Sequence, residues 1–560
     1  MSTQYRFASL DYETDPFKYG RTPKEFALGF YDGTSYWDFW GDDCTEQFIN
    51  FLSNYIETDL YEDEQLIIYA HNGGKFDFFY LIEHLDPDLF MINGRIAKAA
   101  LFGGRVEMRD SWLVLPLPLA SNDKLEIDYK LFEKETRNHH KKEILHYLKR
   151  DCTSLHEWVT GFIDQFGLYM TLASAAFDQL KKTDYDIPTT FEEYDNLFRK
   201  FYYGGRVQCF EVGEFKGHFQ YVDINSAYPT AMLDNHWYGG GYIEHTDFPK
   251  SKNGSWFAEI DAVSKGALPL KAADGKLYFP DDNEARRYLV TGWEINAGIE
   301  TNTLDIKNII ATYRPKRKMN FSQYVNTFIK MKEDADLKMR ECKKNGDEAG
   351  RLYWSARRTF AKLLLNSCYG KFGQDGRKFE KFCIVAHGEW PDDVDWVPHG
   401  EHGDYTIYSR PDPSKRFYNV ATAASITGWV RAFMWKSINQ SQRPLYCDTD
   451  SIICEKFNGD LGLGLGEWDM EARATEVYIA QRKMYAMKVY KKQWPFFDHK
   501  TASKGVRLTY DQIEEGVITG QSIVTERDAP AFSLQHGARF FSRKTDFENI
   551  KKNSLRNPLD

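Results

Sequence analysis

The sequence predicts a multidomain protein of mixed class, with an α/β unit at its N-terminus followed by α+β units. The first observation is the length of 560 residues, which is too long for one hydrophobic core and corresponds to about three or four structural units. The second is the order of the patterns. Strand and helix signals alternate over 1–170, whereas strands dominate 233–330 and helices dominate 320–369.

The composition sets limits on class and location. The eight cysteines form neither a Cys-x-x-Cys pair nor a zinc-type cluster with histidine, so reduced thiols in a cytosolic setting are expected. The sequence has no run of about 20 apolar residues and no signal-peptide pattern. We therefore expect a protein that is neither secreted nor inserted in a membrane.

The net charge of −10 speaks against a nucleic-acid-binding protein only when it is averaged over the whole chain, because the local distribution matters more. Basic residues gather between 314 and 362, beginning with Arg314, Lys316, Arg317 and Lys318. They form either a solvated helical face, since acidic residues are interleaved with them, or a surface that faces phosphates.

Three acids in the N-terminal third lie at the ends of predicted elements. Asp11 and Glu13 are two residues apart on the first predicted strand, so their side chains share one face. Buried acids are costly there unless they are paired or bind a metal. Asp77 follows a second strand at 66–70 and opens a predicted helix, either as a simple N-cap or as a site residue.

A fourth acid lies on an amphipathic helix predicted over 142–166. Tyr147 and Asp151 are four residues apart on one face of it, a spacing that structural pairs also use. One strand and two helices would thus supply four carboxylates to a two-metal hydrolytic site. In such a site the ions lie about 4 Å apart and clamp the attacking and leaving oxygens of a phosphodiester. Tyr147 would orient the attacking water.

A second group of acids is predicted in the C-terminal two thirds. Asp223 ends a strand at 219–224 and faces a turn. Asp448 and Asp450 lie between two apolar runs, a pattern that predicts a β-hairpin with an Asp-Thr-Asp turn. Such a turn is usually just solvated when it stands alone. Carboxylates this close repel each other unless a cation lies beside them, and hard oxygen ligands suit Mg²⁺ or Mn²⁺.

The helix predicted between these segments carries Lys362, Asn366 and Tyr369 on one face. This face suits a nucleotide better than a core, because the lysine can meet a triphosphate and the tyrosine can stack near the base or sugar. The three acids of the second group would then hold two ions that activate a 3′-hydroxyl and stabilise the pyrophosphate leaving group.

The N-terminal acids, with Tyr147, resemble the three exonuclease motifs of proofreading DNA polymerases, of the DEDD type with tyrosine as the fifth residue. The resemblance implies an RNase H-like 3′→5′ exonuclease domain. It also implies that the single-stranded 3′ end is held by Asn72, Phe76 and Ser111. Lys124 matches, more loosely, a lysine that these enzymes use near the scissile phosphate.

The later segments resemble motifs A, B and C of family B DNA polymerases, in the same order: Asp-x-x-Ser-x-Tyr-Pro, Lys-x-x-x-Asn-Ser-x-Tyr-Gly and Tyr-x-Asp-Thr-Asp-Ser. The resemblance implies a right-hand polymerase of palm, fingers and thumb. It makes Asp223 and Asp450 the principal metal ligands, with Asp448 close by. It also makes Tyr228 a steric gate against a ribose 2′-hydroxyl.

The wide spacing of motifs A and B and the short chain resemble the protein-primed subgroup, closest to polymerases of tectivirus-type phages. Three further motifs of the subgroup are matched: the linker motif Tyr-x-Gly-Gly that coordinates synthesis with editing, a Thr-x-x-small-Arg motif with valine at the small position, and the Lys-x-Tyr motif that grips the primer strand. Their residues are Tyr202, Gly204, Gly205, Thr427, Arg431, Lys483 and Tyr485.

The resemblance divides the chain into seven expected segments. In order they are the exonuclease domain at 1–175, a linker and first palm part with motif A at 176–234, a first insertion that contacts terminal protein at 235–335, fingers with motif B at 336–373, a second insertion for processivity and strand displacement at 374–418, palm with motif C at 419–510, and a thumb at 511–560.

The function implied by the resemblance is a DNA-directed DNA polymerase that replicates a linear, terminal-protein-capped genome by protein priming, with a proofreading 3′→5′ exonuclease and strand displacement. Two Mg²⁺ or Mn²⁺ ions are expected in each active site. Expected partners are primer–template and single-stranded DNA, dNTPs, the terminal protein and a phage single-stranded DNA-binding protein. A monomer in the cytoplasm of a bacterial host is expected.

Three other readings of the sequence remain. The first is a family B polymerase of a mobile element that starts without a protein primer. The second is a nuclease that has lost synthesis and kept a DNA-binding hand, and the third is a non-catalytic nucleic-acid-binding protein. The complete polymerase motifs speak against the second reading, and the four exonuclease acids speak against the third.

Overall fold

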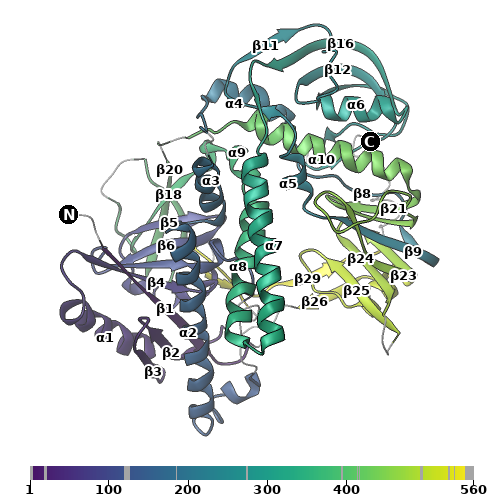
Figure 1. The fold of residues 1–560 in the computed structure, drawn as a ribbon. Coiled ribbons are helices and arrows are strands. Elements are labelled where there is room, and N and C mark those ends of the chain that lie inside the picture. Colours follow the sequence, from purple (N-terminus) through teal and green to yellow (C-terminus); the bar gives the residue numbers. More distant parts are fainter. Residues whose placement is uncertain are drawn as a thin grey trace.

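Two large β-sheets, with a long helical hairpin between them, organise the computed structural model (Figure 1). The structure describes residues 4–17, 22–118, 127–183, 186–272, 275–391, 395–412, 414, 416–491, 496–526, 530–534 and 537–548. Lys124, predicted to lie near a scissile phosphate, falls outside these residues. Within them, every helix is too short or too polar to cross a membrane.

The first sheet has ten strands, and the first predicted strand, β1, is one of its interior strands. β1 runs parallel to β4 and antiparallel to β2, which brings the acids of β1 beside the carboxyl end of β4. In sheet order the strands are β19 (Val397–His402), β20 (Tyr405–Pro411), β18 (Glu380–Ala386), β5 (Asp88–Ile92), β6 (Arg95–Leu101), β7 (Val106–Asp110), β4 (Glu64–Ala70), β1 (Gln4–Thr14), β2 (Glu25–Tyr31) and β3 (Tyr36–Trp40).

Three strands of this sheet come from far along the chain. β18 pairs antiparallel with β5, with Phe382 opposite Leu89, and β20 and β19 follow it. Residues 380–411, predicted to form an insertion of the polymerase part, therefore continue the N-terminal sheet. The pairing covers the edge of β5, which would otherwise expose unpaired backbone groups.

Two helices cover the N-terminal sheet. α1 (Cys44–Thr58) packs through Phe48 and Leu52 on a core with Leu10 and Phe30. α2 (Lys141–Phe166) buries residues at helical spacing, which confirms the helix predicted over 142–166. Two single 3₁₀ turns, η1 (Gly73–Lys75) and η2 (Asp77–Phe79), follow β4. Asp77 was predicted to open a longer helix, but the chain turns again immediately.

The second sheet has seven antiparallel strands and carries the later acids. The hairpin predicted around Asp448 is confirmed as two of its strands. In sheet order the strands are β25 (Phe497–Ser503), β24 (Met484–Tyr490), β23 (Trp468–Gln481), β9 (Gly213–Ile224), β22 (Ser451–Lys456), β21 (Gln442–Asp448) and β8 (Val207–Cys209).

α10 (Val420–Gln440) is buried on nearly all sides and packs on α5 (Ala227–Ala231). It shares a hydrophobic cluster with this sheet. A four-stranded sheet lies at the top of Figure 1. It consists of β11 (Tyr242–His245), β16 (Leu304–Pro315), β12 (Phe257–Ser264) and β15 (Ala285–Thr291), and α6 (Gly292–Glu300) follows it. Four short strands belong to the same region: β10 (His236–Trp237), β13 (Leu270–Lys271), β14 (Leu277–Tyr278) and β17 (Lys318–Met319).

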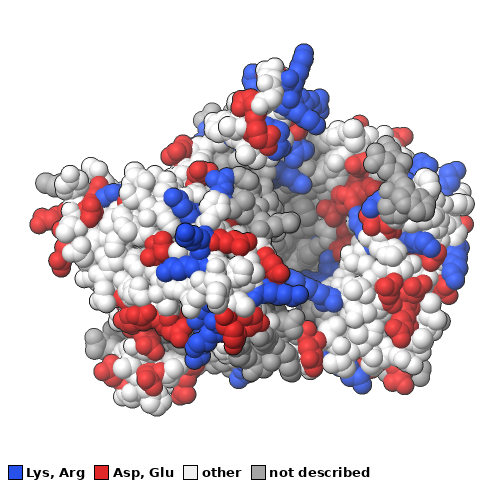
Figure 2. Space-filling model, turned by 90° about the horizontal axis from the view of Figure 1, so that it is seen from below, with Lys and Arg blue, Asp and Glu red and all other residues white. Residues whose placement is uncertain are grey.

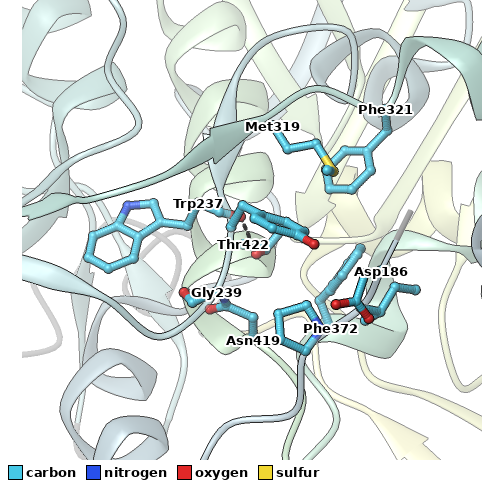
Figure 3. A pocket seen from close by; sticks show the side chains of 11 residues that line it. Asp186, Trp237, Gly239, Met319, Phe321, Phe372, Asn419 and Thr422 are labelled. Carbon is cyan, nitrogen blue, oxygen red and sulfur yellow. Dashed lines mark hydrogen bonds between the residues drawn. The ribbon is translucent and has the colours of Figure 1, made fainter. Parts of the chain in front are cut away.

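A small pocket marks the junction of these parts. It encloses about 10 Å³, the space of one water molecule, between Asp186, Met319, Phe372 and Asn419 (Figure 3). At its wall the Thr422 hydroxyl donates to the Trp237 carbonyl over 2.7 Å. The segment before α4 (Glu192–Phe198), the region of β10 and β17, and α10 are therefore packed together at this point.

α7 (Ser322–Asn345) and α8 (Glu348–Ser367) form the helical hairpin, and Gly346 turns the chain between them in the left-handed region, with φ 69°. The helix predicted to carry Lys362 and Tyr369 on one face breaks at Cys368, so Tyr369 begins α9 (Tyr369–Phe372). α3 (Leu172–Lys182) packs on α8. The described C-terminal elements are α11 (Tyr510–Thr519), β26 (Ile523–Glu526), β27 (Ala531–Ser533), β28 (Gly537–Arg539) and β29 (Ser542–Thr545).

Candidate active sites

A cleft of about 720 Å³ gathers the N-terminal acids. Asp11 and Glu13 reach it from β1, Asp77 from η2, and Tyr147 and Asp151 from α2. All five residues that the sequence assigned to a hydrolytic site therefore line one cavity. We call this cavity and these five residues the N-terminal cleft.

Burial dominates the electrostatics of the N-terminal cleft. Asp77 is buried, and its Oδ1 accepts a hydrogen bond from the Tyr12 N–H over 3.3 Å. Burial raises the pKa of Asp77, and the charge of Asp110 adds to this effect. Burial also raises the pKa of Tyr147, whose hydroxyl lies 3.4 Å from that of Tyr129. Buried carboxylates of this kind gain from a cation that compensates their charge.

The residues predicted to hold a DNA end occupy the rim and the wall behind it. Asn72 and Phe76 line the N-terminal cleft. Asn72 adopts a left-handed conformation, and its Oδ1 accepts from Arg95 over 2.9 Å. Ser111 is buried behind the cleft, where its hydroxyl lies 3.0 Å from His71 Nδ1, so it contacts the cleft through that histidine.

Arg95 and Phe532 are among the residues of the N-terminal cleft that the sequence did not predict. Arg95 lines the cleft and is held by an ion pair with the buried Asp110. Phe532 lines it from β27, with its ring centroid 5.5 Å from that of Phe76. Arg95 stands in an ordinary amphipathic strand and Phe532 lies more than 450 residues from Phe76, so neither carried a local signal.

The later acids meet at one end of the seven-stranded sheet. β22 lies between β21 and β9, with Ser451 opposite both Asp448 and Asp223. The Ile224 N–H donates to the Asp450 carbonyl over 2.8 Å. Thr449 turns the hairpin with φ 59°, in a left-handed conformation that is uncommon for a β-branched residue. We call Asp223, Asp448 and Asp450 the hairpin site.

Mutual repulsion marks the hairpin site. Burial and the charge of Asp450 raise the pKa of Asp223 to about 7. Burial and the charge of Asp448 raise the pKa of Asp450 to about 6. Half-buried carboxylates that disfavour each other's ionisation are suited to divalent cations. Among the described residues, no three His, Cys, Asp or Glu side chains form a ready-made metal-binding group, so the fit depends on donor chemistry and charge.

The predicted nucleotide residues lie on α5, α8 and α9. The rings of Tyr228 and Tyr369 stack face to face, with centroids 4.0 Å apart and an interplanar angle of 9°. Lys362 is exposed on α8, and the Asn366 amide donates to its carbonyl over 2.8 Å. Lys362 therefore remains open to an anionic ligand.

The Lys-x-Tyr motif contacts the hairpin site directly. Lys483 Nζ donates to both carboxylate oxygens of Asp448, over 2.6 and 2.8 Å. Its N–H donates to the Tyr446 hydroxyl over 3.0 Å. Tyr485 is buried, with its ring 5.3 Å from that of Tyr446. The lysine thus lies at the acids, and the tyrosine supports it from the core.

Thr427 and Arg431, predicted to bind substrate, are placed differently by the structure. Arg431 is 1% exposed, and its guanidinium donates to Glu294 over 2.7 Å and to the carbonyls of Tyr203 and Gly204 over 2.8 Å each. Thr427 is buried and its hydroxyl donates to the Ala424 carbonyl. In this structure Arg431 therefore supports the linker, whereas Thr427 is bonded within its own helix.

The Tyr-x-Gly-Gly linker lies against the hairpin site. A Cβ atom on Gly205 would lie 2.6 Å from Thr449 Cγ2, so only glycine allows the linker to approach the turn this closely. The half-buried Tyr202 packs against Gly373, where a Cβ would approach its ring to 2.6 Å. Gly204 contributes its carbonyl to Arg431.

The molecule is hollowed between its two halves. Figure 2 shows Lys and Arg side chains at this hollow, while Asp and Glu are spread over the outer faces and along one of its walls. The overall charge of −10 therefore coexists with basic side chains at this hollow.

Comparisons with known proteins agree with this geometry. The model of the family described as DNA polymerase type B, organellar and viral, matches residues 118–395. The DNA-directed DNA polymerase of Enterobacteria phage PRD1 is 38% identical over 490 residues, which cover 86% of this chain and 83% of that protein. A probable DNA polymerase of Agaricus bitorquis is 26% identical over 600 residues, covering 87% and 72%.

The fold is similar to that of a solved structure. Phi29 DNA polymerase complexed with primer–template DNA matches with a TM-score of 0.72 at 17% identity, over 97% of this chain and 100% of that one. Its ternary complex with DNA and incoming nucleotide matches with a TM-score of 0.70. This similarity of fold confirms the fold class predicted from the sequence, an RNase H-like domain followed by a right-hand polymerase.

Proposed function

The chain belongs to the type B DNA polymerases of the organellar and viral family and is a DNA-directed DNA polymerase, and from this premise we propose that it replicates a linear, terminal-protein-capped genome by protein priming. We further propose that it proofreads with a 3′→5′ exonuclease and displaces the strand ahead. Two separate acidic sites, built from different elements of one chain, carry the proposed pairing of synthesis with proofreading. The 38% identity to the polymerase of phage PRD1 supports the proposal of protein priming.

In synthesis, the hairpin site is proposed to act on the primer end and the incoming dNTP. Asp223 and Asp450, with Asp448, would hold two Mg²⁺ or Mn²⁺ ions, which supply Lewis-acid activation of the 3′-hydroxyl and neutralise the leaving pyrophosphate. Lys362 binds the triphosphate from the exposed face of α8. Lys483 lies close enough to the acids to contact the primer end.

Tyr228 is proposed to select the sugar. Its ring is fixed by face-to-face stacking on Tyr369, so it has little freedom to move aside for a ribose 2′-hydroxyl. Asn366 donates to the Lys362 carbonyl within α8, the helix that precedes Tyr369. Discrimination would therefore depend on a rigid wall rather than on a hydrogen bond to the sugar.

In proofreading, the N-terminal cleft is proposed to hydrolyse the last phosphodiester of a frayed primer. Asp11, Glu13, Asp77 and Asp151 would hold a second pair of divalent ions, and the Tyr147 hydroxyl orients the attacking water. The single-stranded end is held by Asn72 and Phe76 at the rim and by Ser111 through His71, with Lys124 proposed near the scissile phosphate.

The remaining assignments follow from the same premise. The expected domain limits are kept as a proposal, with 235–335 as the contact for terminal protein and 374–418 as the element for processivity and strand displacement. Proposed partners are primer–template and single-stranded DNA, dNTPs, terminal protein and a phage single-stranded DNA-binding protein. The proposed location is the cytoplasm of a bacterial host, where the enzyme acts as a monomer.

The two activities are separated by substitutions at the two sites. Asp450→Ala should abolish nucleotide incorporation and leave degradation of single-stranded DNA intact, because the N-terminal cleft shares no residue with the hairpin site. Asp11→Ala combined with Glu13→Ala should do the reverse. Both activities are measured on labelled oligonucleotides with Mg²⁺. Incorporation by the Asp450 variant would refute the assignment of the hairpin.

Protein priming is tested by mixing the enzyme, Mg²⁺ or Mn²⁺, a labelled dNTP and the candidate terminal protein. A covalent protein–nucleotide adduct is expected, and the Asp450→Ala enzyme serves as the matched control because it should form none. Full activity on a DNA primer without any adduct would instead favour a polymerase that starts without a protein primer.

A further inference from the structure

Arg206 is a buried arginine directly after the linker motif. Its side chain is 0% exposed. Its guanidinium donates to the Gly266 carbonyl over 2.9 Å and to the Gln208 amide oxygen over 2.5 Å. These acceptors are neutral, and the charge of Glu294 reaches the guanidinium without forming an ion pair, so that burial still lowers the pKa of Arg206 to about 10. Such a buried charge is costly for a fold. The buried guanidinium therefore needs another source of stabilisation.

Two aromatic rings enclose the guanidinium. Its Cζ lies 3.9 Å from the ring centroid of Phe279 and 4.2 Å from that of Trp435. A flat guanidinium can stack on two faces at once, which an ammonium cannot do. Phe279 follows β14 and Trp435 lies on α10, where its indole N–H donates to Thr303 over 2.9 Å. The arginine thus joins the linker to two other parts of the molecule.

The backbone of the same residue holds the catalytic turn. The Arg206 carbonyl accepts from the Thr449 N–H over 2.6 Å, and β8 continues the pairing with Val207 opposite Asp448. Thr449 has φ 59°, a conformation that persists in a β-branched residue only where its surroundings fix it. A shift of Arg206 would therefore be passed directly to the acids on both sides of Thr449.

A second arginine fixes the preceding residues. Arg431 lies four residues before Trp435 on α10, and donates to the carbonyls of Tyr203 and Gly204. The segment from 203 to 206 is thus held from α10 at two successive points. We propose that Arg206 is a positioning residue for nucleotide incorporation, which sets the place of the Asp448-Thr449-Asp450 turn by anchoring its neighbouring strand between Phe279 and Trp435.

The proposal rests on the catalytic role proposed above for the hairpin site, and its test uses the full-length enzyme. Arg206→Lys keeps the charge but loses the flat stacking group, and Arg206→Met keeps the aliphatic length. Single-nucleotide incorporation is measured against dNTP and against Mg²⁺ concentration. Degradation of single-stranded DNA serves as the internal control for folding. Arg443→Lys is the matched variant, since Arg443 is a half-exposed arginine of β21 paired with Glu211.

Both Arg206 variants should lose about tenfold to a hundredfold in kcat for incorporation, the scale expected for a misplacement of about 1 Å. KM for dNTP should change much less, and the Mg²⁺ concentration for half-maximal rate should rise several-fold. Exonuclease activity should stay unchanged, and Arg443→Lys should behave like the wild type. A general loss of stability would lower both activities together without moving the Mg²⁺ requirement.

The failures of the two proposals are distinguishable. If Asp450→Ala still incorporates nucleotides, the hairpin site itself is wrongly assigned. If Asp450→Ala is inactive while Arg206→Lys and Arg206→Met retain the wild-type kcat and Mg²⁺ requirement, only the positioning role is overturned. A parallel fall of both activities in the Arg206 variants would overturn it as well, because Arg206 would then be a residue of general stability.

Discussion

The two acidic sites of this polymerase are built by different means. In the N-terminal cleft, Glu13, Asp77 and Asp151 are 6%, 3% and 3% exposed, and they are held by one sheet, one 3₁₀ turn and one long helix. In the hairpin site the Asp448 side chain is 23% exposed, and Asp448 and Asp450 flank a single residue in a left-handed conformation. The packing of separate elements places the acids of the N-terminal cleft, whereas a turn places Asp448 and Asp450 in the hairpin site.

This difference predicts different weaknesses. In the N-terminal cleft the acids lie on a strand, a 3₁₀ turn and a long helix that pack together. Hydrolysis should therefore depend mainly on the individual side chains. In the hairpin site the place of the acids depends on residues that contact no substrate, namely Gly205, Arg206 and, through the linker, Arg431. Backbone changes should therefore affect synthesis more than proofreading.

The strongest test of this contrast is Gly205→Ala. The added methyl group would lie 2.6 Å from Thr449 Cγ2, so the turn or the linker must move. Synthesis should fall about a hundredfold, while degradation of single-stranded DNA should stay at the wild-type rate. Gly204→Ala is the matched control, because no atom lies within 4 Å of its added methyl group. Equal effects of the two substitutions would remove the steric argument.

A smaller effect is expected from Tyr147→Phe in the N-terminal cleft. The substitution keeps the buried ring and removes only the hydroxyl, so the loss corresponds to about one hydrogen bond to the attacking water. Exonuclease activity should fall about tenfold with synthesis unchanged. Tyr129→Phe removes the neighbouring hydroxyl from a ring that is 55% exposed, and it should matter less. A loss in synthesis on Tyr147→Phe would contradict the separation of the sites.

Much of both sites was predictable because their signals are local. A period of two places Asp11 and Glu13 on one face of β1, and helical spacing places Tyr147 and Asp151 on the inner face of α2. Apolar runs on either side of an Asp-Thr-Asp turn predict the hairpin. In each case the element is short or strongly periodic, so neighbouring residues determine its form.

The supports of the sites were not predictable, because they depend on contacts between distant segments. The helix face of Lys362 could be read from spacing, but the stacking of Tyr369 on Tyr228 could not, because the two residues lie 141 positions apart in the chain. The contact of the buried Arg431 with Glu294 could not be predicted from its motif, because the two residues are more than 130 positions apart. The pairing of β18 with β5 joins residues almost 300 positions apart, for which a single sequence carries no pattern.

The last expected effect concerns stability rather than activity and depends on pH. His236 is fully buried behind α5, where its Nε2–H donates to the Ala231 carbonyl over 2.6 Å and its Nδ1 accepts from Ser425 over 2.8 Å. Burial lowers the pKa of His236 to about 4, against weaker opposing effects of the Ala231 hydrogen bond and Asp234. The folded protein therefore keeps this imidazole neutral.

Since an unfolded histidine has a pKa of about 6.5, the unfolded state binds the proton first as the pH falls. The contribution of His236 is fully present above about pH 6.5 and is lost down to about pH 4, with a total of about 3 kcal/mol. The free energy of unfolding, measured by urea between these pH values, should depend less on pH in His236→Gln. His218→Gln, at an exposed position of β9, should keep the wild-type slope, and an equal slope in all three proteins would contradict the prediction. At neutral pH the His236→Gln enzyme should keep both synthesis and exonuclease activity, because His236 supports the helix of Tyr228 without contacting either site.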